Sequence, residues 1–307
     1  MEIKNTLLLL STLLLLLQSC EPAKTDPTPP TSDTTKVDSE VVQKLAPTFN
    51  SPEGVISDGE FLFVSNVGVK LAPTEKDGDG RIMQLSLDGK EWLEKEKWAA
   101  IEFNAPKGMA IVGKMLYVAD IDRVVEIDLK TISQNYVYDF SRFGVNFLND
   151  ICVKDDQTLY VSATDANAIF EVNLVDQNLG ILGTGELRGP NGIVYASEEN
   201  KIYCAEYGTE DQPNGRLVAI DAENGTVNPL IEHEGYLDGL AMTAAGELLF
   251  SDWVDGKLHK MKMTDNSLSI VPFDSVGGPA DFHYISGENK VWLPCMQESK
   301  LKLVEGI

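Results

Sequence analysis

A short segment of apolar, aromatic and small residues recurs six times along the chain. Its copies read FLFVSN at 61–66, MLYVAD at 115–120, TLYVSA at 158–163, KIYCAE at 201–206, ELLFSD at 247–252 and KVWLPC at 290–295. Successive copies begin 43 to 54 residues apart, which is close to the length of a four-stranded propeller blade. The repeat therefore predicts six blades.

A second strand pattern follows most copies of this segment. It reads GRIMQLSLDG at 80–89, DRVVEIDLKT at 122–131, NAIFEVNLVD at 167–176, GRLVAIDAEN at 215–224 and GKLHKMKMTD at 256–265. Apolar and polar residues alternate and the segments end in turn formers, which is typical of half-buried antiparallel strands. The long amphipathic helices that a parallel β/α barrel needs between its strands are missing from the pattern.

The last repeat is one strand short. After 290–295 the chain has only KLKLV at 300–304, whereas a spare apolar segment, residues 41–49, precedes the first repeat. We expect this segment to complete the last blade, because a closed ring leaves no long unpaired sheet edge. The predicted fold is all-β: a six-bladed β-propeller over residues 41–307, closed by its N-terminal strand.

The residues before the propeller indicate export and anchoring. An apolar run at 7–17 is too short for a helix that crosses a membrane, which needs about 20 residues, so residues 1–19 are expected to be a signal peptide. The run ends in LQSC, which resembles the lipobox of bacterial lipoproteins, and the resemblance implies a lipid on Cys20. The alternative is an ordinary signal peptide with a chance cysteine. Residues 20–40, rich in Pro, Thr, Ser and Asp, are expected to form a disordered linker. The expected location is the bacterial cell envelope, at the periplasmic face or the cell surface.

Composition narrows the range of partners. The formal net charge is −23, and no basic stripe interrupts it, so nucleic acid is not an expected partner. Contact with the membrane is expected through the anchor only, and the protein is expected to be a monomer. Cys152, Cys204 and Cys295 lie in or at the end of apolar strands without metal-ligand spacing, which favours buried free thiols.

Each predicted inner strand begins with one polar residue in the same register. These residues are Glu53, Lys107, Asn149, Asn191, Asp238 and Asp281. Asn-Gly and Asp-Gly are common turn dipeptides, so turn chemistry is one interpretation. However, Glu and Lys are poor turn residues, and six inner strands converge on one axis. The second interpretation is therefore a ring of oxygen ligands for calcium or another divalent cation.

Three of these ring residues lie in the short motifs PEGV at 52–55, PNGI at 190–193 and LDGL at 237–240. Set in six such repeats, they resemble the gluconolactonase/senescence-marker-protein-30 group of calcium-dependent lactonases, whose architecture paraoxonase-type and strictosidine-synthase-like propellers share. The resemblance implies that Glu53, Asn191 and Asp238 bind the metal. It also implies that Asn149 joins this metal site, through metal-bound water or substrate, and that Asp238 takes a proton from the attacking water.

Two positions depart from the lactonase pattern. Lys107 stands in the ring, where its ammonium could pair with Asp238 or Glu53 and compete with a cation, act as an electrophile for an anionic substrate, or form a structural ion pair. Phe147 stands where the lactonases carry an arginine that grips the substrate. The phenylalanine favours a more apolar substrate than a sugar-acid lactone.

Loops after the second strand of each repeat are expected to surround the mouth of the channel. They place Arg142, Tyr207 and Trp253 near the rim, where they could set specificity, with ordinary packing as the alternative for Trp253. Arg142 and Tyr207 are candidate substrate contacts, together with Lys107 and Asp281 in the ring and His233 in the loop that enters the fifth repeat. The first hypothesis is a divalent-metal hydrolase of small lactones or carboxylic esters. The alternative is a non-catalytic propeller that binds a sugar, a peptide or a protein partner.

Overall fold

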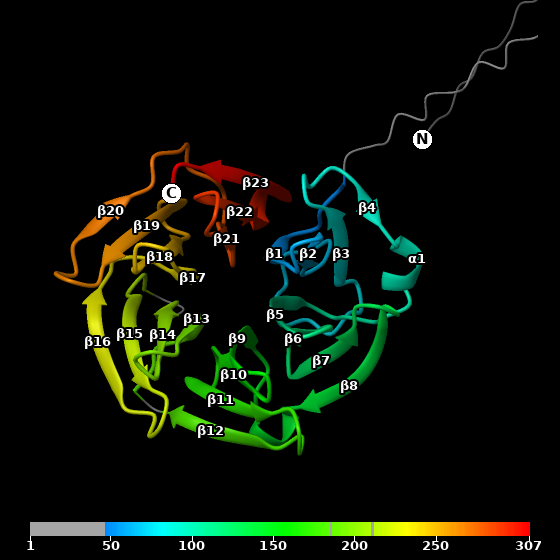
Figure 1. The fold of residues 1–307 in the computed structure, drawn as a ribbon, viewed down its shortest axis with the longest axis horizontal. Coiled ribbons are helices and arrows are strands. Elements are labelled where there is room, and N and C mark those ends of the chain that lie inside the picture. The colour runs from blue at the N-terminus through cyan, green and yellow to red at the C-terminus, as the bar shows by residue number, and fades with distance from the viewer. Residues whose placement is uncertain (1–46, 185, 210–211) are drawn as a thin grey trace, which may run out of the picture. The chain divides into compact units, whose positions relative to one another are not determined.

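Six antiparallel sheets stand around a common centre as the blades of a β-propeller (Figure 1). The computed structural model describes residues 47–184, 186–209 and 212–307. The signal peptide, Cys20, the linker and most of the expected closing strand, residues 41–46, lie outside the described residues. No helix within the described part of the chain has the length and hydrophobicity to span a membrane.

Five blades have four strands each, in chain order from the centre outward. They are β1 (Pro52–Ser57), β2 (Phe61–Asn66), β3 (Arg81–Ser86) and β4 (Trp92–Leu93); β5 (Pro106–Val112), β6 (Met115–Asp120), β7 (Arg123–Asp128) and β8 (Ser133–Asp139); β9 (Leu148–Asp155), β10 (Thr158–Ala163), β11 (Ala168–Asn173) and β12 (Leu179–Thr184); β13 (Pro190–Ala196), β14 (Lys201–Glu206), β15 (Arg216–Asp221) and β16 (Val227–Glu232); and β17 (Leu237–Met242), β18 (Glu247–Asp252), β19 (Lys257–Lys262) and β20 (Leu268–Ile270).

The sixth blade has three strands within the described residues: β21 (His283–Ile285), β22 (Lys290–Cys295) and β23 (Lys300–Glu305). A short helix, α1 (Lys95–Trp98), follows β4, and 3-10 turns span Ser141–Phe143 and Met296–Glu298. The six repeated segments of the sequence are β2, β6, β10, β14, β18 and β22, so the predicted six-bladed propeller is confirmed.

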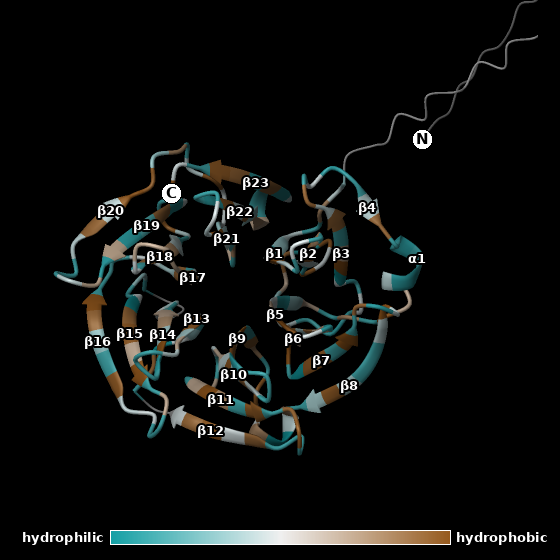
Figure 2. Ribbon diagram, viewed as in Figure 1, coloured by the Kyte–Doolittle hydropathy of each residue, from teal (hydrophilic) through white to brown (hydrophobic). Residues whose placement is uncertain are grey.

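Hydrophobic side chains fill the spaces between neighbouring blades. Six separate core clusters lie at the six interfaces, and each draws residues from two adjacent blades. Figure 2 shows hydrophobic residues on the strands of every blade, as expected where both faces of a sheet pack against another sheet. Cys152, Cys204 and Cys295 are buried free thiols within these cores, as predicted.

The first and last blades close the ring by hydrophobic packing. Trp292 of β22 packs with Val55, Leu62 and Met83 of the first blade, and Phe49 joins the same cluster. Phe49 is the last residue of the segment expected to close the ring, so at least its end reaches the interface between these blades. The strand pairing of residues 41–46 with β23 stays a prediction.

This closure can be tested at Trp292, which is 8% exposed. We expect Trp292→Ala to lower the free energy of unfolding by about 3–5 kcal/mol, because it removes a large side chain from the interface that joins the chain ends. Val175→Ala, at a 70% exposed position, should change stability by less than about 0.5 kcal/mol. Denaturant unfolding measures both, and equal effects would contradict this role of Trp292.

Candidate functional site

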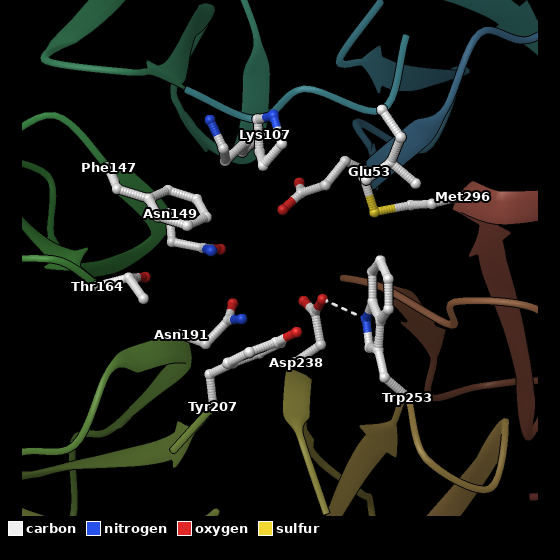
Figure 3. Close-up of a pocket in the computed structure, with 12 residues that line it drawn as sticks. Glu53, Lys107, Phe147, Asn149, Thr164, Asn191, Tyr207, Asp238, Trp253 and Met296 are labelled. Carbon is white, nitrogen blue, oxygen red and sulfur yellow. Dashed lines mark hydrogen bonds between the residues drawn. The ribbon is translucent and has the colours of Figure 1, made fainter. Parts of the chain in front are cut away.

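The inner strands bring one polar side chain each to a single cavity at the centre of the ring. Glu53, Lys107, Asn149, Asn191 and Asp238 are the second residues of β1, β5, β9, β13 and β17. All five line a cavity of about 230 Å³ (Figure 3). Five of the six residues predicted to form the ring therefore lie in one site.

Glycine makes this convergence possible. The third residue of four inner strands is Gly54, Gly108, Gly192 or Gly239, and a Cβ atom there would lie within 2.9 Å of the backbone of the next blade. The strand register is irregular at the same place, as in a β-bulge. These glycines lie within strands, so close backbone approach explains them and turn chemistry does not.

Serine hydroxyls of the second strands fix the irregular segments. Ser65 Oγ accepts a hydrogen bond of 2.7 Å from the backbone N–H of Gly54, and Ser251 Oγ accepts one of 2.8 Å from Gly239. In the third blade, where aspartate replaces glycine, Ser162 Oγ accepts a bond of 2.9 Å from the N–H of Asp150. In these three blades the serine near the end of the repeated segment thus helps to position the polar residue before the irregularity.

Four buried oxygen atoms that face the cavity have no hydrogen-bond partner among the described residues. They are Glu53 Oε2, Asn149 Oδ1, Asn191 Oδ1 and Asp238 Oδ1. Figure 3 shows these side chains, from four different blades, pointing toward one another. A buried polar atom without a partner is costly. Carboxylate and amide oxygens are the donors that calcium and similar hard cations prefer, so this set fits a divalent cation.

The carboxyl groups of the channel resist ionisation. Burial raises the pKa of Asp238 to about 7, and it raises the pKa of Glu53 well above its ordinary value, with a further contribution from the charge of Asp238. Asp150, deeper in the ring, has a pKa raised by burial to about 7. A cation among these groups would favour their charged forms, so cation binding and carboxyl ionisation should be coupled.

Among the described residues that line the cavity, Lys107 is the one with a cationic side chain. Its side chain is buried, its ammonium donates a hydrogen bond of 2.8 Å to Ala105 O, and it lies 5.1 Å from the centre of the Phe147 ring. Among the described residues it forms no ion pair within 4 Å, with Glu53, Asp238 or any other acid. Burial lowers its pKa to about 8, against the opposing effect of Glu53. The ammonium is therefore held at the cavity wall, between Ala105 O and the Phe147 ring.

Trp253 holds Asp238 in place. The indole Nε1–H donates a hydrogen bond of 2.7 Å to Asp238 Oδ2, drawn as the dashed line in Figure 3. This bond occupies one carboxylate oxygen and leaves Oδ1 facing the cavity. It also opposes the effect of burial on the pKa of Asp238. Sequence analysis had not singled out this contact.

Apolar side chains form the rest of the wall. They are Leu71, Pro73, Phe147, Trp253 and Met296, and Thr164 and Tyr207 lie beside them. Four of these residues, Thr164, Tyr207, Trp253 and Met296, directly follow a second strand. The position after the repeated segment was thus a usable signal for rim residues. These four residues show that loops after the second strands line the cavity, as expected.

The remaining predicted contacts have different surroundings. Tyr207 lines the cavity and stacks on Tyr236, with 4.7 Å between ring centres. Asp281 is half-buried outside the cavity lining. Burial raises its pKa, and the charge of Asp150 raises it further.

Arg142 is exposed, with its guanidinium 4.7 Å from the centre of the Phe143 ring. His233 lies 2.8 Å from Asp252, within another cluster. The structure brings neither Arg142 nor His233 to the cavity wall.

The protonation of Asp238 can be tested through stability. Its raised pKa means that the folded state keeps a proton which the unfolded state releases above about pH 4. The parent should therefore lose stability relative to Asp238→Asn as the pH rises from 5 to 7, by at most about 1.4 kcal/mol per pH unit.

Denaturant unfolding in the presence of a chelator measures this difference. Glu198→Gln, at an exposed carboxylate, is the matched control and should follow the parent at every pH. A difference between Asp238→Asn and the parent that does not change with pH would show that Asp238 is ionised in the folded protein.

Comparison with curated proteins gives a distant lactonase relative. No protein-family profile matches the sequence. Lactonase drp35 from Staphylococcus epidermidis is 23% identical over 171 residues, a match that covers 44% of this chain and 52% of that protein. The chain thus spans about half the length of this curated relative.

Solved structures share the fold at low identity. A protein of unknown function from Bacteroides thetaiotaomicron is 14% identical with a TM-score of 0.64, over 84% of this chain and 70% of that chain. Hydrazine synthase from Kuenenia stuttgartiensis is 14% identical with a TM-score of 0.61, over 86% and 79%. An inactive variant of virginiamycin B lyase from Staphylococcus aureus is 15% identical with a TM-score of 0.55, over 86% and 99%. These likenesses support the propeller fold alone.

Proposed function

We propose that this propeller is a hydrolase of small lactones or carboxylic esters that depends on calcium or a similar divalent cation. The observation that carries the proposal is the set of four buried oxygens without partners, contributed by four blades to one cavity. The distant relation to a lactonase supports the same class of reaction. Glu53, Asn149, Asn191 and Asp238 would hold the cation.

A bound cation in this cavity would polarise the substrate carbonyl and acidify a water molecule. Asp238, whose Oδ2 accepts the hydrogen bond from Trp253, would take the proton of the attacking water. The bound cation would lower the pKa of Asp238 and weaken it as a base, so Asp238 would suffice because the same cation also acidifies the water. Lys107, which lines the same cavity, would offer positive charge to the oxygen that becomes negative as the ester bond breaks.

The apolar wall indicates the kind of substrate. Leu71, Phe147 and Met296 would pack against a hydrocarbon group and exclude bulk water from the cavity. A sugar-acid lactone would leave several hydroxyls without partners against these side chains, which is costly. We therefore propose a small lactone or ester with an apolar body, hydrolysed at the cell envelope by a protein anchored through Cys20.

A non-catalytic binding role is the second candidate, and Lys107 is the observation that favours it. An ammonium buried beside Glu53 already supplies positive charge to the cavity. In that case the oxygens would bind a polar ligand, and no cation would be required.

Calcium titration by calorimetry separates the two candidates. The hydrolase proposal predicts one site with a Kd between about 1 μM and 1 mM. Glu53→Gln should weaken binding at least about tenfold, because it removes the charge and keeps the shape. Glu198→Gln, the same change at an exposed position, should bind as the parent does. No binding of calcium, magnesium, manganese or zinc at this cavity would refute the metal-dependent hydrolase and favour the binding role.

Activity assays test the substrate class. Alkyl-substituted lactones and short carboxylic esters should be hydrolysed with a kcat/KM at least about tenfold above that for polyhydroxylated lactones. A chelator should abolish the activity, and calcium should restore it. Equal rates on both kinds of lactone would contradict the role assigned to the apolar wall.

Trp253→Phe tests how Asp238 is positioned. Loss of the indole hydrogen bond should raise the pKa of Asp238, so the acidic limb of the pH–kcat profile should move up by about one pH unit. Trp98→Phe is the matched control, because Trp98 donates a comparable bond of 3.0 Å to Gln84, outside the cavity lining. An acidic limb that stays in place in Trp253→Phe would show that the bond does not act on the catalytic carboxylate.

A further inference from the structure

A second group of metal-ligating side chains lies outside the central cavity, where the fourth and fifth blades meet. It consists of His233, in the loop after β16, Asp252, the last residue of β18, and His259 of β19. One ligating atom from each lies within 4.8 Å of the others. Asp252 and His259 are buried, and His233 is half-buried.

The fold holds both imidazoles against one phenyl ring. His259 pairs with Phe250 across the β18–β19 ladder and stacks on it, with 5.2 Å between ring centres. His233 meets both rings edge-on, at 5.4 Å from Phe250 and 5.1 Å from His259. A backbone hydrogen bond of 2.9 Å to Gly215 fixes the position of His233 on the fourth blade. The two imidazoles therefore come from different blades and are oriented by packing.

Each imidazole faces a carboxylate that the backbone already orients. Asp252 Oδ1 accepts bonds from the N–H groups of Tyr236 and Val254, and its Oδ2 lies 2.8 Å from His233 Nε2. In the same way, Asp255 Oδ1 accepts a bond from the N–H of Lys257, and its Oδ2 lies 2.8 Å from His259 Nε2. Each imidazole of the cluster thus has its own carboxylate partner.

Comparison with two other blades shows what is different here. The acid at the end of the second strand pairs with an arginine across the ladder, Asp120 with Arg123 and Glu206 with Arg216. In the fifth blade the cross-strand partner of Asp252 is Lys257, and its ammonium donates to Phe273 O instead. At Asp252 the imidazole of His233 stands where the other two blades have an arginine.

We propose that His233, Asp252 and His259 bind a zinc-class divalent cation, with Asp255 orienting the imidazole of His259. Imidazole nitrogen with carboxylate oxygen is a donor set that zinc accepts readily, whereas calcium prefers oxygen alone. The cation would supply the positive charge that the buried Asp252 lacks from an arginine. It would also join the fourth blade to the fifth beside Trp253. The backbone N–H of Trp253 donates a hydrogen bond to Tyr236 O.

The chain provides its own control, because it contains three histidines. His283, the third, lines a separate groove with Trp292 between the first and last blades. Zinc chloride is titrated by calorimetry into chelator-treated protein with calcium in excess. We expect one zinc site whose affinity falls at least about tenfold in His233→Gln and in His259→Gln and is unchanged in His283→Gln. Cobalt(II) should give the visible absorption of a tetrahedral nitrogen-ligated site, lost in the same two variants.

Thermal unfolding provides a second readout that does not depend on variants. Zinc should raise the Tm of the parent, since it would bind the folded state. No zinc binding and no rise in Tm would overturn the proposal, as would equal zinc affinity in all three histidine variants. Zinc binding that Glu53→Gln removes would also overturn it, by assigning the metal to the central cavity. Loss of calcium binding with the zinc site intact would count only against the proposed hydrolase.

Discussion

The close approach of neighbouring inner strands is the constraint on which the central site depends. Where Gly54, Gly108, Gly192 and Gly239 stand, the backbone of the next blade occupies the space of a side chain. Strands this close bring the residue before each glycine into the same small volume. The consequence is a group of acids and amides that water solvates poorly, and their chemistry follows from that burial.

Burial and like charge act together in this volume. Glu53 and Asp238 both have raised pKa values, and each carries an oxygen without a partner. One ammonium, that of Lys107, is held by the carbonyl of Ala105. Such an arrangement is unfavourable unless something satisfies the oxygens, because a buried unpaired carboxylate costs several kcal/mol. Buried acids with raised pKa values in a cavity are characteristic of candidate ligand-binding sites.

The sequence predicted the blades and most of the ring, because both depend on local patterns that recur. Alternation and spacing gave six repeats, and a shared register aligned Glu53 with Asp238. Sequence analysis placed Trp253 near the rim but missed its bond to Asp238, since a hydrogen bond between an indole and a carboxylate fifteen residues away leaves no pattern in the chain. It misplaced Arg142 and His233, because side-chain direction at a loop depends on packing against neighbouring blades. Asp281 stands in register but before the start of β21, so its side chain lies outside the cavity wall.

A crystal structure of the protein grown with calcium tests the central claim most directly. The proposal predicts an ion bound by Glu53 Oε2, Asn149 Oδ1, Asn191 Oδ1 and Asp238 Oδ1, at about 2.3–2.6 Å from each oxygen. Lys107 should remain on Ala105 O. A structure in which the Lys107 ammonium lies between Glu53 and Asp238, with no ion among the four oxygens, would contradict it.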